Sequence, residues 1–225
     1  MTVVAIAHRG EPVGHRENTL PAFAAAVALG ADMVEIDLRR TRDGVIVVLH
    51  DQTLERLWGL GVSVGEVDLA EVVALGEGAV RIPTLSDVLQ AVPLPLMVDF
   101  TRREVVLGAL EAVQSAGALE RCLFVTGNVA ALQQLRALSA GARIGLTWID
   151  GPEPPLGLLR ELRAEYWNPM SGFVTPEGVA AVHDAGLLVS TWTVDTAEDM
   201  TRVLEAGVDA VVSNRIAALV AHPGR

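Results

Sequence analysis

The feature that most constrains the fold is a regular alternation of short apolar, β-branched runs with Ala- and Leu-rich segments of helical period. This rhythm is typical of parallel strands joined by crossover helices. The expected strands lie near residues 3–8, 33–40, 95–100, 122–126, 143–148, 165–168, 187–192 and 209–213. The expected helices cover 19–30, 84–92, 103–116, 129–140, 155–164, 175–185, 196–206 and 215–221. Eight such units predict a single (β/α)8 barrel domain over residues 1–225, in preference to an open sheet.

A further strand-like run, "VIVVLH" at residues 45–50, follows the second strand after only "TRDG". A link this short cannot form a parallel crossover, so the run is expected to form a β-hairpin that extends the second strand above the barrel. With Asp43 and Gly44 as a two-residue type I′ turn, the register pairs Asp37 with His50. The hairpin is therefore predicted to return His50 beside Asp37.

The composition argues against several classes of function. A formal charge of −11 disfavours nucleic-acid and anionic-membrane surfaces, because both require basic patches. Locally concentrated cations could still bind a phosphate-bearing small molecule. No uncharged run reaches the roughly 18 residues of a membrane span, and a basic leader is missing, so no stable membrane insertion is expected. The single cysteine, Cys122, lies in an apolar run, which predicts a buried, unreactive thiol in a cytoplasmic protein.

Three acidic residues are expected to face the mouth of the barrel. In "MVEIDL" the alternation puts Glu35 and Asp37 on one face of a strand, and Asp99 ends the apolar run "PLMVD". Neighbouring carboxylates in a partly desolvated mouth repel each other, and a hard cation with oxygen ligands relieves that cost. The acids therefore predict a site for one divalent cation, Mg²⁺ or Ca²⁺. The alternative is a solvated acidic edge.

Two histidines, His8 and His50, also end apolar runs, at the end of the strands where barrel active sites lie. A lone histidine there is more often structural, but a pair can remove one proton and supply another to a leaving alkoxide. Arg9 adds a fork of donors suited to a phosphate. Glu17 and Asn18, further along, are expected to cap the first helix.

Several motifs, taken together and in order, resemble one known family. They are "HRG", "ENT", "VEIDLRRTRDGVIVVLHD", "IPTL", "STWTVD" and "GVDAVVSN", and they span residues 3 to about 216. This combination resembles the glycerophosphodiester phosphodiesterases, which are metal-dependent TIM barrels. The resemblance implies hydrolysis of glycerophosphodiesters to sn-glycerol 3-phosphate and an alcohol.

The resemblance also implies roles for the residues at the expected barrel mouth. His8 and His50 would be the acid–base pair, and Arg9 a phosphate contact. Glu35 and Asp37 would be metal ligands. A neighbouring glycerol hydroxyl would attack first and give a cyclic phosphate.

The chain departs from the family pattern at the end of the third barrel strand. Asp99 and Thr101 stand where the family usually has Glu-x-Lys. Asp99 is expected to be the third metal ligand, because the related sphingomyelinase D barrels use Asp there, whereas Thr101 supplies no cation. Arg9, the metal and either Arg39 or Arg102 are left to balance the charge of the transition state.

Other departures affect the substrate pocket. Trp192, in "TWTVD", would line that pocket, and a core indole is an equal alternative. Asp195 and Asn214 stand where the family usually has Asn and Asp. The segment between His50 and Thr84 is shorter than in many relatives, where an inserted cap helps to select the substrate, and this implies a more open site.

Two other functions compete with phosphodiester hydrolysis. The missing lysine motivates a non-catalytic barrel that binds a phosphorylated ligand. A phospholipase D-like enzyme acting on lipid headgroups is less expected, because no apolar membrane-docking loop is evident. In each case the expected partner is a small molecule and not a nucleic acid.

Overall fold

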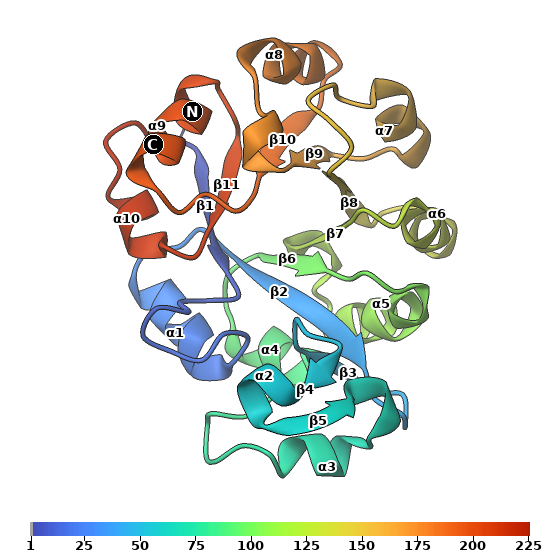
Figure 1. The fold of residues 1–225 in the computed structure, drawn as a ribbon. Coiled ribbons are helices and arrows are strands. Elements are labelled where there is room, and N and C mark those ends of the chain that lie inside the picture. The colour runs from blue at the N-terminus through green and yellow to red at the C-terminus, as the bar shows by residue number, and fades with distance from the viewer. Residues whose placement is uncertain (1) are drawn as a thin grey trace.

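Within residues 2–225, the part of the chain that the computed structural model describes, eight parallel strands close into a barrel (Figure 1). They are β1 (Val4–His8), β2 (Met33–Arg40), β6 (Leu96–Asp99), β7 (Cys122–Thr126), β8 (Arg143–Trp148), β9 (Tyr166–Pro169), β10 (Leu188–Thr191) and β11 (Ala210–Ser213). Each pairs with its neighbour in this order, and β1 pairs with both β2 and β11. The ring is therefore closed, which confirms the barrel and excludes the open sheet.

Helices alternate with the strands and surround them (Figure 1). They are α1 (Leu20–Ala28), α4 (Leu85–Ala91), α5 (Val106–Ser115), α6 (Val129–Leu138), α7 (Leu156–Leu162), α8 (Pro176–Asp184), α9 (Ala197–Glu205) and α10 (Ile216–Val220). Local capping explains several of their starts. Thr84 Oγ1 accepts the N–H of Asp87 at 3.1 Å, and Thr175 Oγ1, just before Pro176, accepts the N–H of Gly178 at 3.0 Å. The predicted helices are confirmed.

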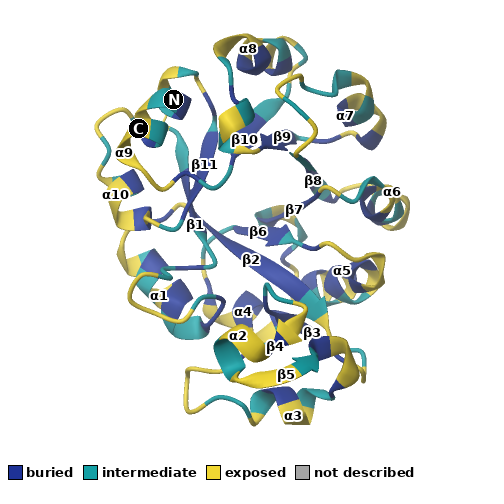
Figure 2. Cartoon of the chain, in the orientation of Figure 1, coloured by how far each residue is buried: buried dark blue, intermediate teal, exposed yellow. Residues whose placement is uncertain are grey.

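Alternation along the strands divides the buried core into two layers of side chains. The barrel strands that carry them are largely dark blue, the colour of buried residues, in Figure 2. Along β2, Val34, Ile36 and Leu38 pack outward beneath the helices, while Glu35 and Asp37 lie on the inward face. The interior layer is formed by Ile6, Met33, Met97, Leu123, Val125, Tyr166, Ala210 and Val212. The inward face thus changes from apolar at the bottom of the barrel to acidic at its mouth.

The two ends of the described chain lie against each other. Arg225 Nε donates to the carbonyl of Val3 at 2.9 Å, and the two ends lie together in Figure 1. Cys122 is buried, as expected, and burial raises the pKa of its thiol to about 11. Across residues 2–225, the helices are all too short or too polar to span a bilayer.

The hairpin after β2 is confirmed, but its predicted register is wrong by one residue. β3 (Ile46–Val48) pairs antiparallel with β2 outside the ring, and Leu38 faces Val48. The N–H of Leu49 donates to the carbonyl of Asp37 at 2.9 Å. Leu49 and not His50 therefore lies opposite Asp37.

The turn of the hairpin is the physical reason for this difference. Gly44 has a positive φ of 92°, but Asp43 does not, whereas a type I′ turn requires positive φ at both central residues. The N–H of Thr41 donates to the carbonyl of Val45 at 3.0 Å, so the loop holds three residues, 42–44.

Residues 51–83, which we call the cap segment, contain short elements that the sequence pattern did not reveal. These are β4 (Thr53–Leu54), α2 (Glu55–Trp58), β5 (Leu60–Ser63), the 3-10 turn η1 (Val64–Glu66) and α3 (Leu69–Val73). Together with the hairpin they bury a small core of their own, made of Val47, Leu49, Leu54, Val64, Val67, Val72 and Ile82. The cap segment lies beside the end of β2 (Figure 1).

Candidate active site

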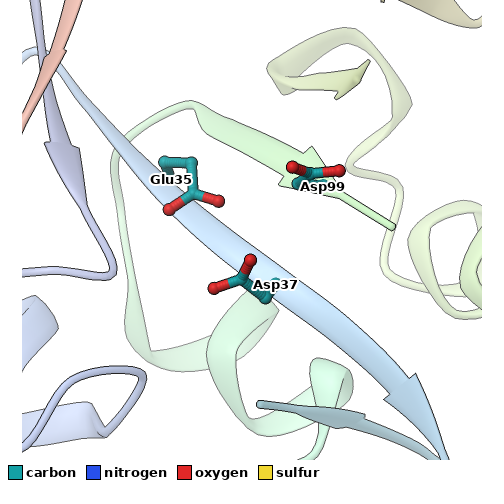
Figure 3. Close-up of side chains that lie close together, drawn as sticks. All are labelled: Glu35, Asp37 and Asp99. Carbon is teal, nitrogen blue, oxygen red and sulfur yellow. The ribbon is translucent and has the colours of Figure 1, made fainter. Parts of the chain in front are cut away.

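Three carboxylates meet at the carboxyl end of the barrel (Figure 3). The pairing of β2 with β6 puts Asp37 beside Asp99, and Glu35 lies two residues earlier on the same face of β2. One oxygen from each residue lies within 4.8 Å of the other two. Glu35 and Asp37 are buried, at 4% and 6% exposure, and Asp99 is partly exposed. The structure thus brings together the three residues predicted to bind a metal.

The acid cluster is electrostatically unfavourable without a cation. Burial raises the pKa of Glu35 well above its usual range, and the charges of Asp37 and Asp99 add to this. Burial likewise raises the pKa of Asp99 to about 7, with a contribution from Asp37. An adjoining cavity of about 30 Å³ exceeds the roughly 10–15 Å³ that one water needs. The donor set and the space therefore fit one hard divalent cation.

His8 lies beside Glu35 across the β1–β2 pairing, with Nε2 3.9 Å from Glu35 Oε2. Its Nδ1 lies 2.8 Å from Oδ1 of Asn214. Asn214 Nδ2 donates to Asp195 Oδ2 at 2.7 Å, so the amide oxygen must face the imidazole. Nδ1 of His8 therefore carries the proton, and Nε2 presents its lone pair to the acid cluster. Burial and the charge of Arg9 lower the pKa of His8, which favours a neutral base.

Arg9 occupies a turn that the sequence can form because a glycine follows it. Arg9 and Gly10 have positive φ values of 57° and 85°, and a Cβ on Gly10 would lie 2.7 Å from the backbone carbon of Ala22. This turn directs the N–H of Arg9 to Glu35 Oε2 at 3.0 Å. It also holds Arg9 Nε 3.2 Å from Asp37 Oδ2. The arginine thus lies against the acid cluster.

Glu17 and Asn18 belong to this site and do not cap α1 as expected. Asn18 has a positive φ of 56°, and its Nδ2 donates to Asp37 Oδ2 at 2.8 Å. Glu17 accepts hydrogen bonds from Arg9 at 3.0 Å and from Arg56 at 2.7 Å. The available signal was the polar run "HRENT" inside the first strand-to-helix connection, because such connections form barrel active sites.

His50 lies at the rim, with a side chain 43% exposed against 14% for His8. Its Nδ1 lies 2.7 Å from Asp51 Oδ1. Arg56 donates to both oxygens of Asp51 and, with His50, lowers the pKa of that carboxyl to about 2. The ionised carboxylate can only accept a hydrogen bond, so Nδ1 of His50 is the donor and Nε2 is left for chemistry.

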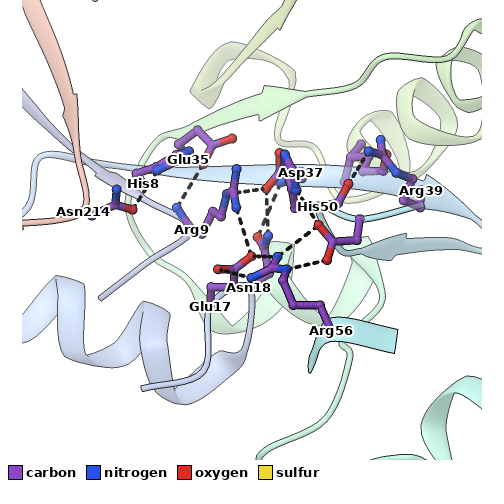
Figure 4. Close-up of polar contacts among 12 residues, drawn as sticks. His8, Arg9, Glu17, Asn18, Glu35, Asp37, Arg39, His50, Arg56 and Asn214 are labelled. Atoms are coloured by element: carbon purple, nitrogen blue, oxygen red, sulfur yellow. Dashed lines mark hydrogen bonds and ion pairs between the residues drawn. The ribbon is translucent and has the colours of Figure 1, made fainter. Parts of the chain in front are cut away.

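The two imidazoles flank Arg9 and Asp37 in Figure 4. Neither a hydrogen bond nor an ion pair joins His50 to Asp37 within residues 2–225, so the contact that the hairpin register predicted is wrong. His50 reaches the mouth because the backbone after β3 turns there, where its carbonyl accepts from Arg39 Nη2. The cap segment, through Asp51, then orients its ring.

Trp192 forms one wall of the 30 Å³ cavity, together with His8, Glu35, Asp99 and Asn168. Its Nε1 donates to the carbonyl of Asn168 at 3.1 Å, and its ring packs against the interior core layer. Trp192 therefore lines the cavity beside the acid cluster and also packs against the core, and its contact with a substrate stays a prediction. Asn168 is a further residue of this region that sequence reasoning missed.

A guanidinium stands next to Thr101, where the chain has no lysine. Arg39 Nη1 donates to Thr101 Oγ1 at 3.2 Å. Burial lowers the pKa of Arg39, and the nearby charges of Asp37 and Asp99 oppose this effect. Arg102 instead makes a long contact of 3.4 Å with Gln52. Arg39 is thus the cation beside Thr101.

Comparisons with known proteins agree with this geometry. The model of the glycerophosphoryl diester phosphodiesterase family matches residues 8–218. A glycerophosphodiester phosphodiesterase of Caldanaerobacter subterraneus is 30% identical, with 95% of each chain covered. A probable glycerophosphodiester phosphodiesterase of Mycobacterium tuberculosis is 32% identical over 94% of this chain and 87% of its own. The crystal structure of a putative glycerophosphoryl diester phosphodiesterase from Silicibacter pomeroyi has a TM-score of 0.85 at 26% identity, covering 96% and 93% of the two chains. The chain belongs to the glycerophosphoryl diester phosphodiesterase family.

Proposed function

We propose that this protein hydrolyses glycerophosphodiesters to sn-glycerol 3-phosphate and an alcohol, with one divalent cation. The observation that carries the proposal is the acid cluster of Glu35, Asp37 and Asp99 with His8 beside it. The family and the relatives named above support the same reaction. Mg²⁺ and Ca²⁺ both suit three carboxylate ligands. The ion, when bound, supplies positive charge to the phosphoryl oxygens.

The two histidines divide the proton transfers. His8 Nε2, with its lone pair toward the cluster, accepts the proton of the attacking hydroxyl. Attack by water gives sn-glycerol 3-phosphate directly. Attack by a neighbouring glycerol hydroxyl gives a cyclic phosphate, which a water molecule then opens to sn-glycerol 3-phosphate. His50 gives a proton to the leaving alkoxide, and the Asp51 carboxylate at 2.7 Å stabilises the imidazolium before transfer. Arg9 and Arg39 stabilise the negative charge that develops on the phosphoryl group.

We further propose that residues 1–225 act as one domain in the cytoplasm. The pairing of β1 with β11 supports a single domain, because the barrel needs strands from both ends of the chain. The free, buried Cys122 supports a reducing compartment. The partner in this proposal is a small phosphodiester.

An assay with purified protein tests the activity. We expect release of sn-glycerol 3-phosphate from a panel of glycerophosphodiesters, loss of turnover on chelation, and recovery with Mg²⁺, Mn²⁺ or Ca²⁺. The metal that restores the highest kcat identifies the working ion. Turnover that survives complete chelation would contradict the metal-dependent mechanism, and failure on every diester would favour a non-catalytic phosphate-binding barrel. The Arg39–Thr101 contact weakens that alternative, which rests on the missing lysine.

A further inference from the structure

A second, larger cavity of about 380 Å³ opens between the hairpin, the cap segment and the loop after β6. Arg39, Arg40, Arg42 and Arg102 line it, and Glu104 is the one acid among its lining residues, all of which lie within residues 2–225. In the whole sequence acids outnumber basic residues by 28 to 17. The ratio is reversed in this cavity, so its charge is a local feature.

Most of this positive charge is not neutralised by the protein itself. Arg42 is paired, at 2.7 Å to Asp68 and 3.2 Å to Glu71. Arg40 and Arg102, in contrast, form no ion pair with any acid of residues 2–225.

Arg39 also forms no direct ion pair within residues 2–225, although Asp37 and Asp99 lie near it. It donates to neutral oxygens: the carbonyls of Leu38 and His50 and the hydroxyl of Thr101. Since guanidinium groups present planar forks of donors, they suit carboxylate and phosphate groups. The cavity is therefore a candidate anion site.

The distance from the acid cluster to the cavity matches the length of a short alcohol. Arg39 follows Asp37 by two residues on β2, which is about 7 Å along a strand. An alcohol of two or three carbons separates the phosphorus atom from a group at its far end by several bonds of about 1.5 Å each. These bonds span a similar distance. The backbone oxygen of His50 is bonded to Arg39, and His50 is the proposed donor to the leaving alcohol. An alcohol that leaves beside His50 would therefore extend toward the arginines.

We infer that this arginine-lined cavity binds an anionic group, a carboxylate or a second phosphate, carried by the alcohol part of the glycerophosphodiester. The inference rests on the proposed hydrolysis and specifies its substrate class. Neutral alcohols gain nothing there, and cationic alcohols such as choline are repelled.

Three matched diesters test this inference, with glycerol, glyceric acid or glycerol phosphate as the alcohol. We expect kcat/KM to be at least tenfold higher for one or both anionic alcohols than for glycerol, and the better of the two identifies the bound group. Arg102→Gln and Arg40→Gln should each reduce that preference about fivefold to tenfold, mainly through KM. Arg103→Gln is the matched control, because the neighbouring Arg103 bonds Gln134 outside the cavity.

Equal kcat/KM values for the three diesters would overturn the inference, as would an equal loss on all of them in Arg102→Gln. Calorimetry separates this failure from failure of the proposed function. The His8→Ala variant, which should not turn over substrate, should bind the anionic diesters about tenfold more tightly than the neutral one. Equal affinities there would refute the cavity's role whether or not the protein is a hydrolase.

Discussion

Asn214 shows how a single residue can set the chemistry of another. Its amide is fixed by Asp195 at 2.7 Å and so forces His8 to present Nε2 to the acid cluster. Asp195 and Asn214 stand where the family usually has Asn and Asp. The pair thus still contains one carboxylate and one amide, but their positions are exchanged. The amide of Asn214 now contacts the imidazole of His8, and the carboxylate of Asp195 contacts that amide. His8 is held by a neutral acceptor.

Changing Asn214 to Asp should move the pH profile. A carboxylate against Nδ1 stabilises the imidazolium and raises the pKa of His8, which burial now lowers. More of the base is then protonated at low pH, so kcat/KM at pH 6 should fall several-fold more than at pH 8. The measurement is kcat/KM against pH for Asn214→Asp and for the double variant with Asp195→Asn. An unmoved acidic limb would show that Asn214 does not govern this imidazole.

Removing either imidazole tests the acid–base roles. His8→Ala and His50→Ala should each lower kcat by about 10² to 10⁴, the usual contribution of general acid–base catalysis, with an unchanged circular dichroism spectrum. His183→Ala is the control, since His183 lies on α8 and contacts Asp209 away from the mouth. A variant that keeps more than about half of the parent rate would identify its histidine as structural.

Substitutions in the acid cluster, unlike substitutions of other acidic residues, should weaken metal binding. Glu35→Gln and Asp37→Asn should remove measurable binding of a divalent ion in calorimetry, because a neutral amide is a poorer ligand and lowers the charge of the cluster. Glu55→Gln, an exposed acid at the start of α2, should bind the ion like the parent. Parent-like affinity in both cluster variants would rule out this metal site.

At the scale of elements, the β1–α1 connection carries much of the site. It places Arg9 and Asn18 against Asp37 of β2. Both residues, and Gly10 between them, have a positive φ. The packing of Gly10 against the backbone of Ala22 leaves no room for a side chain there. The geometry of the phosphate contact thus depends on one backbone turn.

Gly10→Ala should damage stability and site together. The added Cβ would meet the Ala22 backbone at 2.7 Å with φ at 85°, a combination that costs about 1–3 kcal/mol. Chemical denaturation should show this loss, and kcat should fall as Arg9, the proposed phosphoryl contact, shifts. Gly14→Ala, in the same connection, meets only a flexible Glu11 oxygen at 3.1 Å and should change little. Equal stability of the two variants would contradict this account of the turn.

Elements with a clear period could be predicted from the sequence, and those set by loop conformation could not. The barrel strands and outer helices have strong periodicity, and the inward faces of β2 and β6 follow from alternation, so the three acids were found. The hairpin register depended on whether Asp43 takes a positive φ, which its residue type permits but does not require. The cap-segment elements hold only two to five residues each, too few for a period. Asn18 was missed because its left-handed conformation and its hydrogen bond to Asp37, which lies 19 residues away in sequence, leave no local pattern.

At the scale of the whole molecule, the acid cluster couples folding to pH and to metal. Asp99 has a pKa near 7 in the fold against about 4 in an unfolded chain. At pH values between about 4 and 7, Asp99 is therefore protonated in the native protein and ionised in the unfolded chain. The free energy of unfolding of the metal-free protein therefore falls as the pH rises through this window. A bound cation stabilises the ionised cluster and offsets this loss.

The stabilisation by a divalent ion should consequently depend on pH. Metal must displace the proton of Asp99, so the rise in Tm on adding Mg²⁺ or Ca²⁺ should be larger at pH 8 than at pH 5. Thermal scans at both pH values, with NaCl of equal ionic strength as the control, measure this difference. The same rise at both pH values would show that the ion does not compete with that proton.

Because the first and last barrel strands pair, the strands could be made in a different order along the chain and still form the same ring. Val3 and Arg225 are in contact, and Gly78 lies at an exposed turn of the cap segment with φ at 57°. A circularly permuted chain, with the old ends joined by a short linker and new ends at Gly78, would keep each barrel pairing and the whole acid cluster. It would place β6 first and β2 last in synthesis, so that the three carboxylates would come together only when the last barrel strand had been made.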